Sequence, residues 1–139
     1  MGHVTRLGVS MEPMLLKAFD RRIRRAGYAS RSEALRDVVR DYLVTGEWED
    51  GVEPVVGTVT LVYDHDRREL EKTLTDLQHH VHGAIACSTH VHLDRHNCLE
   101  VVVVRGTPAQ VRGIADRLIS TRGVKHGKLV CTTTGERIG

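Results

Sequence analysis

Residues 84–105, AIACSTHVHLDRHNCLEVVVVR, consist of two largely apolar stretches on either side of a polar loop. The turn residues at 94–97 predict a hairpin that joins a strand over 84–93 to a strand over 98–105. His90 and His92 lie two positions apart in the first strand, so both imidazoles point to the same face of the sheet. The segments before and after this hairpin decide which fold it belongs to.

Helices and strands are predicted to alternate around the hairpin. Before it, residues 55–63 have the period of a strand, and residues 67–80 have leucines at helical spacing. After it, Thr107 and Pro108 open a helix, and residues 124–133 form a last strand. The order β-α-β-β-α-β predicts an α+β domain of the ferredoxin-like kind over residues 55–139.

The first 46 residues predict a separate module of one strand and two helices. Residues 6–11 alternate between polar and apolar side chains, a helix follows from Pro13, and Ser30 to Glu33 form a capping box that starts a second helix. So small a unit buries too little surface to be stable alone, and its single strand has no partner. We therefore expect an intertwined ribbon-helix-helix dimer in which two strands pair, with the acidic residues 47–54 as a linker.

This module, residues 1–46, is predicted to bind double-stranded DNA. It is basic, whereas the rest of the chain is slightly acidic. Arg6, Gly8 and Ser10 form the outward face of the strand, where Arg6 would bond to guanine and Ser10 to several bases. Main-chain N–H groups near Arg31 and Ser32 would hold a phosphate. The alternative is a dimerisation module with no role in DNA binding.

The hairpin also predicts a metal site. A five-residue loop over 93–97 would place Cys98 opposite His92, with about 4.5–5.5 Å between their Cβ atoms. Two imidazoles and one thiolate then converge, and Glu100, on the same face, would accept a hydrogen bond from a ligating histidine. The apolar residues between these positions are expected to face the core: Val91, Leu99 and Val101.

The fourth ligand is expected from the end of the preceding helix. His79 lies on the side of that helix opposite its leucines, so it points away from its own core and is best placed to reach another chain. Metal binding and assembly would then be energetically linked. His80 and His82 lie to the sides. Three imidazoles and a thiolate suit tetrahedral Zn(II) or square-planar Ni(II) or Cu(II), and the residue types leave that choice open.

The composition excludes several classes of protein. No apolar run approaches the roughly 18 residues of a membrane span, and the first residues do not have the pattern of a secretory signal, so we expect a cytoplasmic protein. Three cysteines argue against a disulfide framework, and Cys87 and Cys131 are interpreted as small core residues. No nucleophile and base lie in a catalytic layout, so we expect neither an enzyme nor a small organic substrate.

Five segments give the chain a resemblance to the nickel-responsive regulator (NikR) family, and together they extend over almost its whole length. These segments are Gly27-Tyr28 with residues 31–37, Leu77-Gln78-His79, residues 90–92, residues 98–100 and residues 123–127.

The resemblance implies a homotetramer, built as a dimer of dimers, of chains that each join a ribbon-helix-helix module to an ACT-like domain. It implies one square-planar Ni(II) per subunit, held by His90, His92 and Cys98 with His79 of a neighbouring chain. Nickel-bound protein would repress nickel-uptake genes at a palindromic operator. It also implies an alkali-metal site, for K⁺, that includes Glu33, although a helix cap explains this residue as well.

Three further features follow from the same comparison. Asp37 matches the second acidic residue of the alkali-metal site, and Arg67 and Arg68 match a loop that can approach DNA in relatives. Gly8 replaces the Thr or Ser of some relatives, so the operator must differ, and Val81 interrupts the histidine cluster. Two alternatives stay open: a metal-storage or delivery protein, and a regulator that responds to copper, zinc or cobalt.

Overall fold

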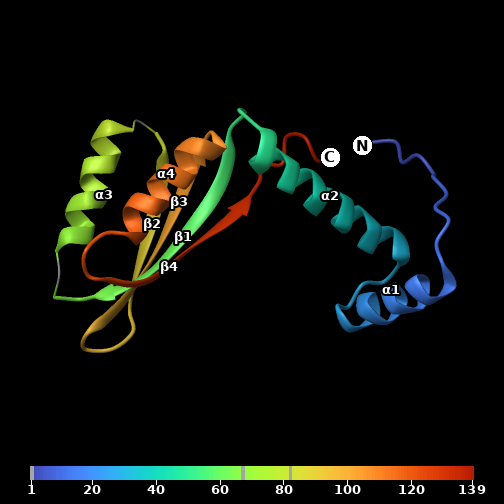
Figure 1. Cartoon of the computed structure of the whole chain (residues 1–139), viewed down its shortest axis with the longest axis horizontal. Helices are drawn as coiled ribbons and strands as arrows, with labels where there is room; N and C mark the ends of the chain where they lie inside the picture. The colour runs from blue at the N-terminus through green and yellow to red at the C-terminus, as the bar shows by residue number, and fades with distance from the viewer. Residues whose placement is uncertain (1, 67, 82) are drawn as a thin grey trace. The chain divides into compact units, whose positions relative to one another are not determined.

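A computed structural model of the chain describes residues 2–66, 68–81 and 83–139 (Figure 1). Their internal contacts divide the chain into two compact units, Met1–Asp41 and Tyr42–Gly139. The first unit contains helix α1 (Pro13–Arg25) and the beginning of helix α2 (Arg31–Asp50).

Helix α1 begins and ends where the sequence predicts, and α2 begins at the predicted capping residue. Pro13 occupies the first turn of α1, and Gly27, with φ of +84°, follows its end. The hydroxyl of Ser30 accepts a hydrogen bond from the backbone N–H of Glu33 at 3.2 Å, which caps α2. The guanidinium of Arg31 donates two hydrogen bonds of 2.8 Å to the carboxylate of Asp20 and so ties α2 to α1.

The predicted strand over residues 6–11 does not form in the single chain. Residues 2–12 have no regular secondary structure, because a strand needs a hydrogen-bonded neighbour and this chain alone supplies none. In this unit, the buried hydrophobic residues among those described are Ile23 and Ala34. Large apolar side chains of this unit are exposed: Leu7, Val9, Met14, Leu15, Val38 and Val39. The module therefore lacks a core of its own.

Helix α2 extends further than the sequence predicts. The acidic residues 47–54 were interpreted as a linker, but the helix continues through Gly46 to Asp50. The interpretation was wrong because a packing contact stabilises these last turns. The side chain of Trp48 is only 5% exposed and belongs to the hydrophobic core of the second unit.

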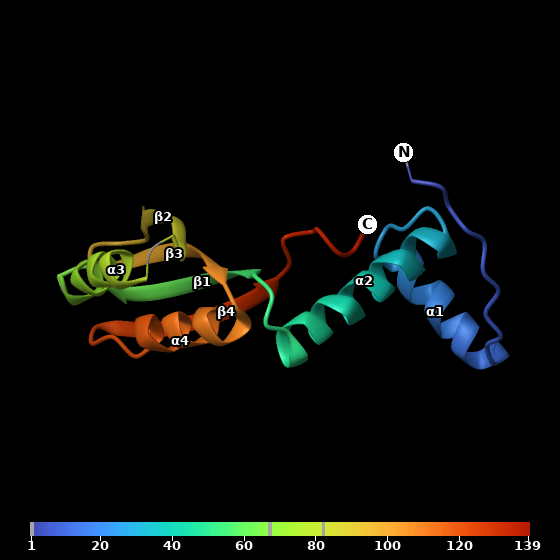
Figure 2. The same cartoon turned by 90° about the horizontal axis from the view of Figure 1, so that it is seen from above.

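The second unit is a four-stranded antiparallel sheet with two helices. Its strands pair in the order β2-β3-β1-β4 (Figures 1 and 2). This order, with the succession β-α-β-β-α-β, confirms the predicted ferredoxin-like arrangement. Its elements in chain order are β1 (Val55–Asp64), α3 (Glu69–His80), β2 (Ile85–His92), β3 (Asn97–Gly106), α4 (Pro108–Ile119) and β4 (Val124–Thr132).

Both helices contribute to one core with the alternate residues of β1 and β3. The fully buried side chains of this core include Val59, Leu61, Leu70, Val102, Val111 and Leu118. The helix-covered face of β3 also carries Cys98 and Glu100, which are both buried. The prediction that Val91, Leu99 and Val101 face this core was therefore wrong: the helices cover the other face, Val91 is 45% exposed, and Leu99 and Val101 are half-buried.

The other two cysteines also differ from expectation. Cys87 and Cys131 are exposed rather than in the core. They lie in β2 and β4, the two edge strands of the sheet. Each of these strands is paired with another strand on one side only. Among the cysteines, Cys98 alone is buried.

Candidate metal centre

The β2–β3 hairpin brings the predicted ligands together. His92 is paired with Cys98 across the two strands, and His90 with Glu100, as the predicted loop length requires. The ring centroids of His90 and His92 lie 4.7 Å apart, so both imidazoles occupy the same side of β2. The predicted register of the hairpin is confirmed.

A third histidine, which the sequence reasoning missed, joins this group. His65 follows the end of β1, and its Nδ1 lies 3.3 Å from the Sγ of Cys98, while Nδ1 of His92 lies 3.5 Å from the same sulfur. The potential ligand atoms of these three residues all lie within 4.8 Å of one another. The alternation of β1 could have indicated His65. Tyr63 pairs with Cys98, and a residue two positions further along a strand points to the same side as Tyr63.

His90 is oriented by two buried groups, one on β3 and one on β1. Its Nδ1 lies 2.7 Å from the hydroxyl of Tyr63 and 3.1 Å from a carboxylate oxygen of Glu100. Tyr63 and Glu100 are themselves 3.4 Å apart, and both are buried. Since Nδ1 is engaged, the other ring nitrogen of His90, Nε2, remains for a ligand. Glu100 therefore has the predicted contact with a candidate ligand.

Burial governs the chemistry of the Cys98 thiol. Removal from water raises the pKa of Cys98, and the negative charge of Glu100 acts in the same direction, while a hydrogen bond from Tyr63 lowers it. Burial and the nearby Glu100 also raise the pKa of Tyr63, so its hydroxyl stays protonated and able to donate. A thiol is not a metal ligand until it loses its proton, and burial together with the charge of Glu100 opposes that loss.

The histidines at the end of α3 do not join the cluster within one chain. His79 is exposed, and the group that lies around Cys98 in the described part of the chain does not include it. His80 contacts its own helix through Nδ1 and the backbone oxygen of Asp76, at 2.7 Å, and lines a shallow groove between α3 and α4. His82 lies outside the described residues.

The predicted DNA-binding residues are accessible. Arg6, Gly8, Ser10 and Ser32 are exposed. The Arg31 side chain is committed to Asp20, which leaves the backbone N–H groups of this turn for a phosphate. Arg68 is exposed just before α3, whereas Arg67 lies outside the described residues.

The acidic pair assigned to an alkali-metal site has other contacts. Asp37 accepts a hydrogen bond from the Tyr28 hydroxyl at 2.7 Å and pairs with Arg40 at 3.3 Å. The backbone of Glu33 is engaged by the Ser30 cap. Both side chains are exposed.

Fold and site together define a class: a small helical module that needs a second chain, joined to an α+β domain with an imidazole and thiolate cluster. Comparison with known proteins supports this class. Residues 5–46 match the family described as ribbon-helix-helix protein, copG family, and residues 56–132 match the family described as NikR C terminal nickel binding domain.

Relatives match the whole chain. A protein of Geobacter metallireducens is 56% identical over 99% of both chains, and one of Thermococcus onnurineus is 54% identical over 97% of this chain and 98% of its own. One of Pyrococcus furiosus is 53% identical over the same shares, and all three carry the name of nickel-responsive regulator. The chain belongs to the nickel-responsive regulator family.

Membership in this family establishes the general function of the chain. The chain is a nickel-responsive, DNA-binding transcription regulator that works as an oligomer, and it is not an enzyme. Within the described residues, no helix is long and apolar enough to cross a membrane.

Proposed function

We propose that the protein represses nickel-uptake genes by binding a palindromic operator when nickel is bound. The observation that carries this proposal is the placement of His90, His92 and Cys98 on one hairpin, in a chain that also contains a DNA-binding class of module. Two imidazoles and a thiolate are a donor set suited to a borderline transition metal such as Ni(II).

Four residues would hold one Ni(II) per subunit. Cys98 would bind through Sγ and His90 through Nε2, because Tyr63 and Glu100 engage its other nitrogen. His92 completes the set within the chain, and His79 of a neighbouring chain supplies the fourth ligand. The exposure of His79 favours this assignment, and so does its absence from the group of ligand atoms around Cys98 in the described residues. When bound, nickel would supply a coordination link between two chains.

We infer a homotetramer, assembled as a dimer of dimers. The exposed apolar side chains of the first unit require a second copy to cover them, which accounts for a ribbon-helix-helix dimer over residues 1–46. The shared metal site then requires contacts between the ACT-like domains, residues 55–139, of different chains. Helix α2 leads from the first domain into the second.

Operator binding is assigned to the outward face of the paired strands. Arg6 and Ser10 would contact base edges, and Gly8 would contribute a position without a side chain. The first turn of α2, at Arg31 and Ser32, would hold a phosphate through backbone N–H groups. Arg67 and Arg68 would approach the DNA backbone. A K⁺ site at Glu33 and Asp37 is part of the same proposal.

A gel-shift titration with a palindromic operator tests the proposal. We expect operator affinity to rise when one equivalent of Ni(II) per subunit is added and to fall when it is chelated. Equal operator affinity with and without nickel would contradict the proposal and favour a metal-storage or delivery role. The size of the assembly is measured in parallel, because a species that stays a dimer contradicts the tetramer.

The His65 group favours a second candidate for the identity of the metal. His65, His92 and Cys98 offer three ligand atoms from a single chain, an arrangement open to a tetrahedral ion such as Zn(II). The optical spectrum of the Ni(II)-loaded protein distinguishes the two sites. A square-planar nickel–thiolate spectrum supports the shared site, and a tetrahedral spectrum supports the His65 group.

A further inference from the structure

Trp48, the single tryptophan of the chain, lies near the end of α2 with its side chain buried. Its indole Nε1–H donates a hydrogen bond of 2.8 Å to the backbone oxygen of Thr132, the last residue of β4. The guanidinium carbon of Arg112, in α4, lies 5.3 Å from the centroid of the indole ring, within the range of a cation–π contact. One side chain thus ties the end of α2 to both the sheet and a helix of the metal-binding domain.

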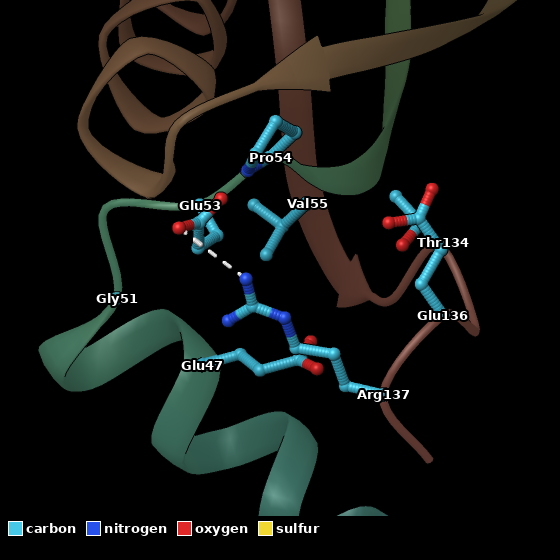
Figure 3. Close-up of a pocket in the computed structure, with 8 residues that line it drawn as sticks. All are labelled: Glu47, Gly51, Glu53, Pro54, Val55, Thr134, Glu136 and Arg137. Atoms are coloured by element: carbon cyan, nitrogen blue, oxygen red, sulfur yellow. Dashed lines mark ion pairs between the residues drawn. The ribbon is translucent and has the colours of Figure 1, made fainter. Parts of the chain in front are cut away.

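Neighbouring residues reinforce this attachment, but Trp48 dominates it. Val44, one turn earlier in α2, packs against the same core. The segment after β4 lies beside the end of α2, where Arg137 forms an ion pair of 3.3 Å with Glu53 next to Glu47 (Figure 3). Both partners of that pair are more than half exposed, so the pair contributes little to stability. Burial of the large indole is the principal contact.

Trp48 lies in a helix, α2, that extends from one unit of the chain into the other. The helix begins at Arg31, in the unit that carries the predicted DNA contacts, and its last turns, from Tyr42, belong to the unit that carries the histidine and cysteine cluster. Gly46 lies within these last turns, two residues before Trp48, and an internal glycine weakens a helix. Without the anchor, these turns would behave as a flexible linker, through which the state of one domain has little effect on the other.

We propose that Trp48 is a positioning residue for nickel-dependent DNA binding. By holding the last turns of α2 on β4 and α4, it makes the helix that leads from the DNA-binding module a part of the metal-binding domain. The presence or absence of nickel in the metal-binding domain can then affect the DNA-binding module, because one continuous helix, α2, links the two. This proposal rests on the nickel-dependent operator binding proposed above.

Two substitutions in the full-length protein test the role. Trp48→Phe keeps an aromatic ring and removes the N–H donor, whereas Trp48→Leu also removes the contact with Arg112. The control is Glu49→Gln, the next residue of the helix, whose side chain is exposed. Nickel affinity is measured by titration, and operator affinity is measured with and without Ni(II).

We expect both variants to bind nickel with wild-type affinity. The gain in operator affinity that nickel produces should fall by about tenfold in Trp48→Leu, within the roughly 5- to 150-fold range of typical allosteric couplings, and by less in Trp48→Phe. Glu49→Gln should retain the whole gain. Hydrogen exchange should show faster exchange of the amides of residues 44–50 in the Trp48 variants alone. If Trp48→Leu does not fold, the Phe variant carries the test.

The outcomes separate the two proposals. If the wild type responds to nickel and the Trp48 variants respond equally, although residues 44–50 exchange faster, the role assigned to Trp48 is overturned and the proposed function stands. If the wild type binds its operator equally with and without nickel, the proposed function fails and this inference fails with it. If the variants lose nickel affinity, Trp48 supports the metal site itself, which also overturns the proposal.

Discussion

Cys98 faces His92 across the β2–β3 hairpin, with its sulfur 3.5 Å from Nδ1 of that histidine and 3.3 Å from Nδ1 of His65. Cys98 is the buried residue of this group, and both of its histidines are exposed. A metal at this point would therefore be reached from solvent on the histidine side and would rest on the hydrophobic core on the cysteine side.

Replacement of Cys98 by serine should abolish tight nickel binding, because the thiolate is the only sulfur donor of the cluster. The Ni(II)-loaded wild type should show thiolate-to-nickel charge-transfer absorption that the variant lacks. Cys87→Ser and Cys131→Ser are the matched controls, since both cysteines are exposed and lie outside the cluster. A Cys98→Ser protein that keeps wild-type nickel affinity would contradict the assignment.

His65→Ala and His90→Ala should differ in their effect on nickel. The proposed site uses His90 and not His65, so His90→Ala should lose tight nickel binding while His65→Ala retains it. Isothermal titration with Ni(II) and Zn(II) measures both. The reverse result, with nickel affinity lost in His65→Ala alone, would place nickel in the group of His65, His92 and Cys98.

Tyr63→Phe should weaken nickel binding without unfolding the domain. The hydroxyl of Tyr63 holds Nδ1 of His90 at 2.7 Å, and loss of a group that orients a ligand typically costs about 10- to 100-fold in metal affinity. Competition with a chelator gives the affinity, and circular dichroism checks the fold. Unchanged affinity would show that Glu100 alone orients His90.

Gly127→Ala should destabilise the protein, whereas Gly113→Ala should stabilise it. A Cβ at Gly127 in β4 would lie 2.6 Å from Ile119 and 2.9 Å from Leu61, so overpacking should cost about 1–3 kcal/mol. A Cβ at Gly113 in α4 meets nothing within 4 Å, and alanine is favoured over glycine in a helix by about 1 kcal/mol. Denaturant unfolding of the metal-free proteins measures both changes, and equal effects would contradict the packing of β4 against α4.

Asp20→Asn should destabilise the DNA-binding module at neutral pH but not in acid. The hydrogen bond from Arg31 holds the pKa of Asp20 below its ordinary value in the folded state. A carboxylate with a lowered pKa contributes stability above its unfolded pKa of about 4, and that contribution is lost as the pH falls through the folded value. Thermal unfolding of wild type and variant should therefore converge below about pH 4. A difference that persists in acid would mean that the ion pair is not its cause.

Much of the fold could be predicted from the sequence because its signals are local. Period-two alternation and helical spacing mark the elements, and the loop of the hairpin sets the pairing of His92 with Cys98. The capping residue Ser30 likewise marks the start of α2. Such features depend on neighbours within a few positions, so no tertiary information is needed to find them.

Other features depended on contacts between segments far apart in the chain. The sequence placed His90, His92 and Cys98 in one hairpin, but only the tertiary structure added His65 and Tyr63, because the pairing of β1 with β3 brings them to Cys98. The tertiary structure also decided which face of the sheet the helices cover. Alternation of side chains along a strand separates the two faces but does not indicate which face is buried. The length of α2 was decided in the same way: Trp48 folds its last turns onto β4, and that long-range burial outweighs the turn-forming preference of the local sequence.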